Sequence, residues 1–148
     1  MKHYVTCIVF DEEMKKTVLI IKNGKLPFLK GKLMNPGGSI EQGETLNQAA
    51  SREFNEECGV AIDESKWSFV GTLILNENGN EIAHCHYVKA VIPTADLLTA
   101  RQMEEEPVII GEISAITLDI IDADVLAMFV LAYSRGCKVG PTTYTRYL

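Results

Sequence analysis

Residues 33–60 combine a Pro-Gly-Gly segment and a glycine-rich loop with a helical pattern that carries a group of acidic residues. The stretch reads LMNPGGSIEQGETLNQAASREFNEECGV. On a helix, residues three and four positions apart lie on one face, so Glu56 and Glu57 both lie close to Glu53. Exposed like charges at this spacing cost about 0.2–0.5 kcal/mol per pair, and burial raises that cost. The pattern predicts a positively charged partner for the three carboxylates.

The acidic residues border the apolar side of this helix. At about 100° per residue, Glu53 and Glu57 fall within roughly 20° of Leu46, and Ala50 and Phe54 lie on the same half of the helix. A fully solvated acidic face would lie on the other side. The simplest partner is therefore a divalent metal ion, and ligands made only of oxygen suit Mg²⁺ or Mn²⁺ better than Zn²⁺. The alternative is a charged helix face without a function.

Local chemistry predicts where this helix begins and ends. Thr45 and Gln48 have the spacing of a capping box, which places the helix start at Thr45. Gly59 is a typical helix stop. Upstream, Pro36, Gly37 and Gly38 predict a turn in which glycine permits positive φ and brings the backbone close to a ligand.

The spacing of the fixed residues resembles the signature of the Nudix hydrolases. Gly38 is followed after five residues by Glu44, and after seven more by the run REFNEECGV at residues 52–60. Every fixed polar and glycine position of the signature is matched. The one departure is Phe54, which stands where an aliphatic residue is usual and affects the local packing rather than the chemistry.

The resemblance implies a site built on Mg²⁺, with Mn²⁺ as the alternative. Glu53, Glu56 and Glu57 would bind the metal together with the backbone carbonyl of Gly37. Glu53 is also a candidate for accepting the proton of the attacking water. Arg52 would brace the cluster by pairing with a carboxylate, and Glu44 would position metal through water or fix the loop.

Family members often use a further acidic residue from a later loop. Glu112 is the first candidate because it precedes the predicted last strand, and Glu106 is the second. Neither choice follows from a motif, and a surface role is the alternative for each.

Apolar, β-branched runs around this stretch predict strands. With two helices from different parts of the chain they predict an α/β (α+β) fold, in agreement with the αβα sandwich and mixed sheet that the resemblance implies. A single domain is expected over residues 1–148. An Asn78-Gly79 hairpin is predicted between the third and fourth long strands. The predicted elements are strands at 4–10, 17–22, 33–35, 67–75, 81–92 and 114–118, and helices at 45–58 and 122–134.

His84 and His86 alternate onto one face of a predicted strand. A His-x-His pair can bind zinc, but the sequence offers no third ligand at a usable spacing. Ordinary sheet residues are the simplest interpretation, and contacts to a nucleotide base or a zinc ion are the alternatives.

Composition limits the class of protein. The net charge of −6 disfavours a broad nucleic-acid surface, and it requires local positive charge wherever a polyphosphate binds. The four cysteines are scattered without a CxxC pair, which favours reduced thiols in a cytoplasmic protein. No run reaches transmembrane length, and a monomer or homodimer is expected.

The resemblance implies metal-dependent hydrolysis of a diphosphate linkage in a nucleoside diphosphate derivative. A pyrophosphohydrolase that clears nucleoside triphosphates is favoured, because residues 75–78 carry neither the proline nor the tyrosine that marks two other family subgroups. ADP-ribose, FAD and dinucleoside polyphosphates are the alternative substrates. Outside enzymes, the rival is a non-catalytic nucleotide sensor, which would not need the intact acidic set.

Overall fold

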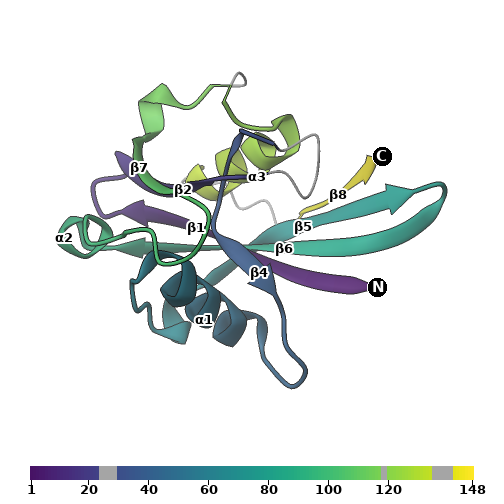
Figure 1. The fold of residues 1–148 in the computed structure, drawn as a ribbon, viewed down its shortest axis with the longest axis horizontal. Helices are drawn as coiled ribbons and strands as arrows, with labels where there is room; N and C mark the ends of the chain where they lie inside the picture. The colour runs from purple at the N-terminus through teal and green to yellow at the C-terminus, as the bar shows by residue number, and fades with distance from the viewer. Residues whose placement is uncertain (24–29, 118–119, 135–141) are drawn as a thin grey trace.

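The computed structural model describes residues 1–23, 30–117, 120–134 and 142–148 of the chain. One mixed β-sheet is flanked by α1 on one face and α3 on the other (Figure 1). This arrangement confirms the predicted αβα sandwich. The elements are β1 Lys2–Asp11, β2 Lys16–Ile21, β3 Leu33–Met34, β4 Gly37–Ser39, α1 Leu46–Cys58, η2 Glu64–Lys66, β5 Ser68–Glu77, β6 Asn80–Ile92, α2 Thr94–Leu97, β7 Val108–Glu112, η3 Ile113–Ala115, α3 Ala123–Tyr133 and β8 Thr142–Tyr147.

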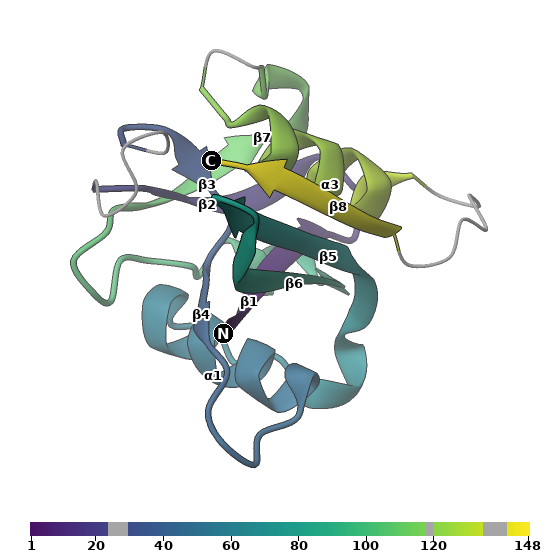
Figure 2. The same ribbon diagram turned by 90° about the vertical axis from the view of Figure 1, so that its right-hand side faces the viewer.

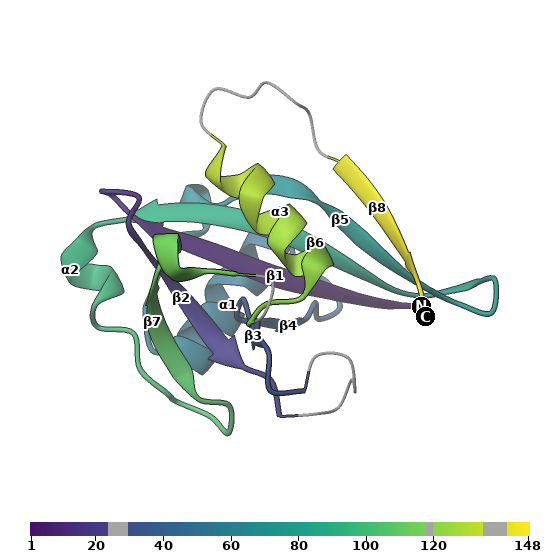
Figure 3. The ribbon, with the colours of Figure 1, turned by 90° about the horizontal axis from the view of Figure 1, so that it is seen from above.

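The sheet has eight strands and a central parallel pair. Its main path runs β3-β2-β1-β6-β5-β8, while β4 pairs with β1 and β7 pairs with β2. The β1–β6 and β5–β8 pairs are parallel, and the other strand pairs are antiparallel. Figure 3 shows α3 lying across the strands, with the long β5–β6 hairpin extending past them.

Each face of the sheet has its own apolar core, because β1 alternates its side chains between the two faces. Val5, Cys7 and Val9 pack under α1, against its buried residues Ala50 and Phe54. On the other face, Ile8 and Phe10 pack with Met128 and Phe129 of α3. Figure 2 shows the two helices on opposite sides of the sheet. These layers hold α1 firmly against β1 and β4.

The predicted ends of α1 are confirmed. Thr45 caps the helix through a complete capping box with Gln48. Gly59 ends it in the left-handed conformation, at φ 71°. Phe54 is fully buried and meets Trp67 edge to face, with ring centroids 6.1 Å apart. The aromatic side chain at this position is therefore accommodated by the core.

The predicted hairpin is also confirmed. Asn78 and Gly79 have φ values of 53° and 83° and join β5 to β6. Two consecutive positive φ values are those of a type I′ turn, whose twist matches the flanking strands.

Two sequence predictions of the fold are wrong. Gly37 and Gly38 form strand β4, which pairs with β1, so they do not make a turn. The strand expected at 114–118 is absent among its described residues, since Ser114 lies in η3 and the pairing with β2 stops at Glu112, opposite Lys16. Leu118, the last residue of that expected strand, lies outside the described residues. The sequence made no prediction for residues 142–147, which form β8 beside β5.

Two further sequence expectations concern cysteines and membranes. Cys7, Cys58 and Cys85 are free thiols, whereas Cys137 lies outside the described residues. Burial raises the pKa of each of these three thiols. Within the described part of the chain, none of the helices has the length and apolar character needed to cross a bilayer.

Candidate functional site

Arg52 lies at the centre of the predicted site. Its guanidinium is held in two places by Glu44, with Nε to Oε1 at 2.6 Å and Nη2 to Oε2 at 2.9 Å. Nη1 donates to Glu53 Oε1 at 2.8 Å and to Glu56 Oε2 at 3.3 Å. Nη2 also donates to the carbonyl of Ser39 at 2.9 Å. Arg52 therefore gathers three acidic side chains and ties them to the end of β4.

These contacts change the protonation of both partners. The hydrogen bonds from Arg52 lower the pKa of Glu44, which is held ionised. In turn, the hydrogen bond to Glu44 raises the pKa of Arg52. The ion pairs are partly shielded from water, since the side chains of Arg52 and Glu44 are 24% and 15% exposed. The bracing role expected for Arg52 matches this geometry.

Glu57 forms a hydrogen bond with the backbone of β4, whereas the other acids of the site pair with Arg52. Its Oε2 accepts the backbone N–H of Gly37 at 3.0 Å, which links the last turn of α1 to β4. Among the described residues, no cation forms an ion pair with Glu57. Burial raises its pKa to about 7, opposed by the Gly37 N–H and the charge of Lys22 and reinforced by Glu53 and Glu104.

The side chain of Glu53 lies against Gly38 of β4. A Cβ placed on Gly38 would overlap the Glu53 carboxylate, so this strand position has to be glycine for the side chain to lie where it does. A Cβ on Gly37 would overlap the backbone of Val5 in β1. The two glycines are thus required by close approach, and neither has the positive φ that the turn prediction assumed.

The environment of Glu53 and Glu57 fits a cation. Burial raises the pKa of Glu53 even though Arg52 contacts it, and the charges of Glu56 and Glu104 add to the rise. A nearby cation favours the ionised form of a carboxyl group, so it would offset the burial and the like charges that raise these two pKa values. Their donor atoms are all oxygen, as Mg²⁺ and Mn²⁺ prefer. Glu56 lies at the edge of this group, with its side chain 48% exposed.

The structure separates the two candidates for a later acid. Glu106 pairs with Lys22 at 3.0 Å, and that lysine is close enough to Glu57 to lower its pKa. Glu112 is 56% exposed and pairs with Lys16 at 2.9 Å. Lys16 and Lys22 lie at opposite ends of β2, roughly 20 Å apart at the usual rise of a strand. Glu112 is therefore not brought together with the acids of α1.

Glu104 is a neighbour that the sequence did not single out. Its charge raises the pKa of both Glu53 and Glu57. The loop that carries it runs along the end of α1, because Met103 N–H donates to the Glu57 carbonyl at 3.2 Å. The run of three glutamates at 104–106 was the only available signal, and it does not by itself indicate which residue faces the helix.

Asn35 is a second residue that the sequence did not single out. It is 1% exposed, and both polar atoms of its side chain lack a hydrogen-bond partner within the described part of the chain. A buried amide without partners is costly. Because Asn35 lies two positions before Gly37, it places unsatisfied donor and acceptor groups next to the site in sequence.

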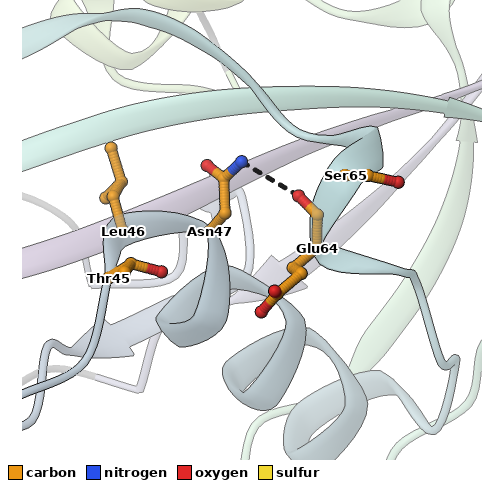
Figure 4. A pocket seen from close by; sticks show the side chains of 5 residues that line it. All are labelled: Thr45, Leu46, Asn47, Glu64 and Ser65. Atoms are coloured by element: carbon orange, nitrogen blue, oxygen red, sulfur yellow. Dashed lines mark hydrogen bonds between the residues drawn. The ribbon is translucent and has the colours of Figure 1, made fainter.

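A pocket of about 410 Å³ lies elsewhere, at the N-terminal end of α1 (Figure 4). It is lined by Thr45, Leu46 and Asn47 of the helix start and by Glu64 and Ser65 of η2. Asn47 donates to the Glu64 carbonyl at 2.9 Å. No predicted site residue lines this pocket, and Glu57 lies at the other end of the helix.

The fold and the site together define an αβα sandwich protein in which the acidic helix α1 packs against the short strand β4, which contains Gly37 and Gly38. The model of the NUDIX domain matches residues 2–123 of this chain. That match covers most of the sequence, so the chain belongs to the Nudix hydrolase family, and the resemblance seen in residues 38–60 is confirmed.

Individual relatives are more distant. The curated relative m7GpppN-mRNA hydrolase NUDT17 from Xenopus laevis is 36% identical over 64 residues, which is 43% of this chain and only 22% of the relative. The mutator MutT protein of Bacillus halodurans has a TM-score of 0.70 at 19% identity, over 99% of this chain and 90% of that one. The NUDIX domain of Shewanella oneidensis NrtR, solved with ADP ribose, has a TM-score of 0.71 at 16% identity, over 89% and 86%. The two solved structures support the fold alone.

Proposed function

We propose that this protein is a divalent-metal-dependent hydrolase that cleaves a diphosphate linkage in a nucleoside diphosphate derivative, with a nucleoside triphosphate as the favoured substrate. The observation that carries the proposal is the position of Glu57. It is a partly buried carboxylate whose pKa burial raises to about 7; the charge of Glu53 adds to that rise, and the Gly37 N–H donates to it. Binding Mg²⁺ or Mn²⁺ there would offset the repulsion between the acids.

Glu53, Glu56, Glu57 and the Gly37 carbonyl would hold the metal. When bound, it would neutralise phosphate charge and lower the pKa of the attacking water. The residues of the chain then have separate tasks. Glu57 is oriented by the Gly37 N–H, while Arg52 fixes the direction of Glu53 and Glu56. Glu53 would accept a proton from water, because burial raises its pKa and so makes it a better base than a solvated carboxylate.

Positive charge for the phosphates is scarce in this acidic protein. Within the described part of the chain, Lys22 is a basic residue whose charge acts on Glu57 and lowers the pKa of that carboxyl. It is shared with Glu106. The overall field of a chain with net charge −6 opposes a polyphosphate, so binding would depend strongly on the metal.

The substrate choice has one specific rival. The Xenopus laevis relative acts on capped mRNA according to its name, and a cap contains a dinucleoside polyphosphate linkage. That relation makes a dinucleoside polyphosphate the second candidate, ahead of ADP-ribose and FAD.

A substrate panel with product identification tests the proposal. The panel contains the nucleoside and deoxynucleoside triphosphates, ADP-ribose, FAD, a diadenosine polyphosphate and a capped dinucleotide, each with Mg²⁺, with Mn²⁺ and with chelator. Mass spectrometry of the products in isotopically labelled water shows which phosphorus is attacked. We expect triphosphates to give a monophosphate and pyrophosphate only when metal is present.

Two results would overturn it. Turnover that survives complete removal of metal would contradict the metal-dependent mechanism. Nucleotide binding without turnover of any compound, in protein whose Glu53, Glu56 and Glu57 are intact, would instead establish the sensor alternative.

A further inference from the structure

All three histidines of the chain meet at one place on the sheet. His3 on β1 is the register partner of His84 on β6, and His86 lies two residues further along the same face. One ring nitrogen from each lies within 4.8 Å of the others. Within the described residues, this is the only group of three His, Cys, Asp or Glu side chains with ligand atoms this close.

We propose that His3, His84 and His86 form a second metal site, which takes a divalent transition-metal ion of the Zn²⁺ type. Two imidazole nitrogens on one tetrahedral zinc lie about 3.3 Å apart, given zinc–nitrogen bonds of about 2.0–2.1 Å. His3 Nδ1 and His86 Nε2 are 3.1 Å apart, so this pair already has nearly the required spacing. The ligand atom of the third ring, that of His84, lies within 4.8 Å of the other two.

Neighbouring side chains orient two of the rings. Glu81 Oε2 lies 2.8 Å from His84 Nε2, and Thr72 Oγ1 lies 3.0 Å from His86 Nδ1. Metal-binding histidines usually hold their second nitrogen in this way, against a carboxylate or another acceptor. The bond to Glu81 leaves Nδ1 of His84 for the metal, and the bond to Thr72 leaves Nε2 of His86 directed at His3.

The chemistry of the group favours a metal over three unrelated sheet residues. Imidazole is a ligand for Zn²⁺, Ni²⁺, Cu²⁺ and Co²⁺, whereas Mg²⁺ prefers oxygen. Three ligands also leave a fourth tetrahedral position open to water or another group.

The site is distinct from the acidic group on α1. His3 and His84 come from adjacent parallel strands, near the start of β1 and on the long β5–β6 hairpin (Figure 1). Glu57 lies at the last turn of α1, against β4. A metal held by the histidines would pin the first residues of β1 to β6, and through Thr72 to β5.

Untagged full-length protein, freed of metal and kept in excess Mg²⁺ to fill the carboxylates, tests the site. Zn²⁺ is titrated by calorimetry, and Co²⁺ is added separately as a probe whose visible absorption reports tetrahedral nitrogen ligands. We expect one Zn²⁺ per chain and a rise in Tm. Loss of a side chain that orients a metal-binding histidine typically costs about 10–100-fold in metal affinity, so Glu81→Gln should fall in that range, and His3→Gln and His84→Gln should each exceed it.

The matched control is Cys85→Ser. This thiol lies between the two β6 histidines in sequence but packs with the core on the α3 side of the sheet, so its removal should leave Zn²⁺ affinity unchanged. Circular dichroism of each variant verifies that it is folded. The proposal is wrong if the wild-type protein binds no Zn²⁺ under these conditions, or if folded His3→Gln and His84→Gln bind Zn²⁺ as tightly as the wild type.

Discussion

Arg52 and Glu44 form a two-point ion pair, with Nε to Oε1 at 2.6 Å and Nη2 to Oε2 at 2.9 Å. Glu44 lies just before α1 and Arg52 lies within it, so the pair closes the loop after β4 onto the helix. The same guanidinium also binds the Ser39 carbonyl and Glu53. One residue thereby sets the positions of the loop, the strand end and a predicted metal ligand.

Arg52→Lys should reduce both stability and turnover, because an ammonium cannot reproduce the planar two-point contact. Charged hydrogen bonds contribute about 1.5–3 kcal/mol, and we expect a loss in that range in the free energy of unfolding, measured with urea. Arg101→Lys is the control, since among the described residues that guanidinium reaches only backbone carbonyls, at 3.4 and 3.5 Å. Equal losses in the two variants would contradict the role of Arg52.

Alanine at Gly37 and at Gly38 should have different effects. At Gly37 the new Cβ meets the backbone of β1, which cannot move, and we expect a loss of about 3 kcal/mol or more in unfolding free energy. At Gly38 it meets the flexible end of Glu53. Gly38→Ala should therefore stay folded while kcat/KM falls by about tenfold or more, through a displaced carboxylate. Unfolding curves and kinetics on both variants decide the point; a fully active Gly38→Ala would contradict it.

The late acid can be identified by comparing three variants. Glu104 and Glu106 lie beside the site. We expect Glu104→Gln and Glu106→Gln each to lower kcat/KM by about tenfold or more, as for a group that supplies negative charge or transfers a proton. Glu112→Gln loses only an exposed ion pair with Lys16, which is worth about 0–1 kcal/mol. Its turnover should equal that of the wild type. A large loss confined to Glu112→Gln would restore the first choice made from the sequence.

The sequence could predict those features that depend on residues close together in the chain. The ends of α1 followed from Thr45, Gln48 and Gly59 because capping acts over a few residues. The β5–β6 turn followed from Asn78 and Gly79 for the same reason. The spacing from Gly38 to Glu57 likewise gave the family, and with it the acids of the predicted site.

What the sequence could not predict depends on contacts between distant segments. Strand β4 exists because Gly37 and Gly38 pair with β1, more than thirty residues earlier in the chain. His3 joins His86 across 83 positions of sequence, so no local spacing could have revealed a third histidine. The nearness of Glu104 and Glu106 to α1 depends on how the loop before β7 packs.

Glu57→Gln should abolish most of the turnover without unfolding the protein. Removing one preorganised electrostatic contact typically costs on the order of 3 kcal/mol in the transition state, about 100-fold in rate. The amide is isosteric and can still accept the Gly37 N–H. Asn55→Ala, an exposed neighbour on the same helix, is the control. Turnover near the wild-type value in Glu57→Gln, measured with Mg²⁺ and the best substrate of the panel, would remove Glu57 from the mechanism.

The same carboxyl should make the stability of the metal-free protein depend on pH. Its pKa rises from 4.5 to about 7 on folding, so between these values the folded state binds more protons than the unfolded state. Stability must then fall as pH rises through this window and level off above about pH 7. Below the lower value both states are protonated, and the penalty vanishes.

Glu57→Gln isolates this contribution, because the amide does not titrate. In chelator, the unfolding free energy of Glu57→Gln minus that of the wild type should grow from about pH 5 to about pH 7 and then remain constant. Added Mg²⁺ should reverse the order at high pH, since a bound ligand stabilises the folded state and metal binding requires the ionised carboxylate. Urea titrations across this range, with and without Mg²⁺, measure both effects. A difference that does not change with pH would mean that Glu57 is ionised in the folded protein without a metal, and the case for a cation beside it would lose its main physical support.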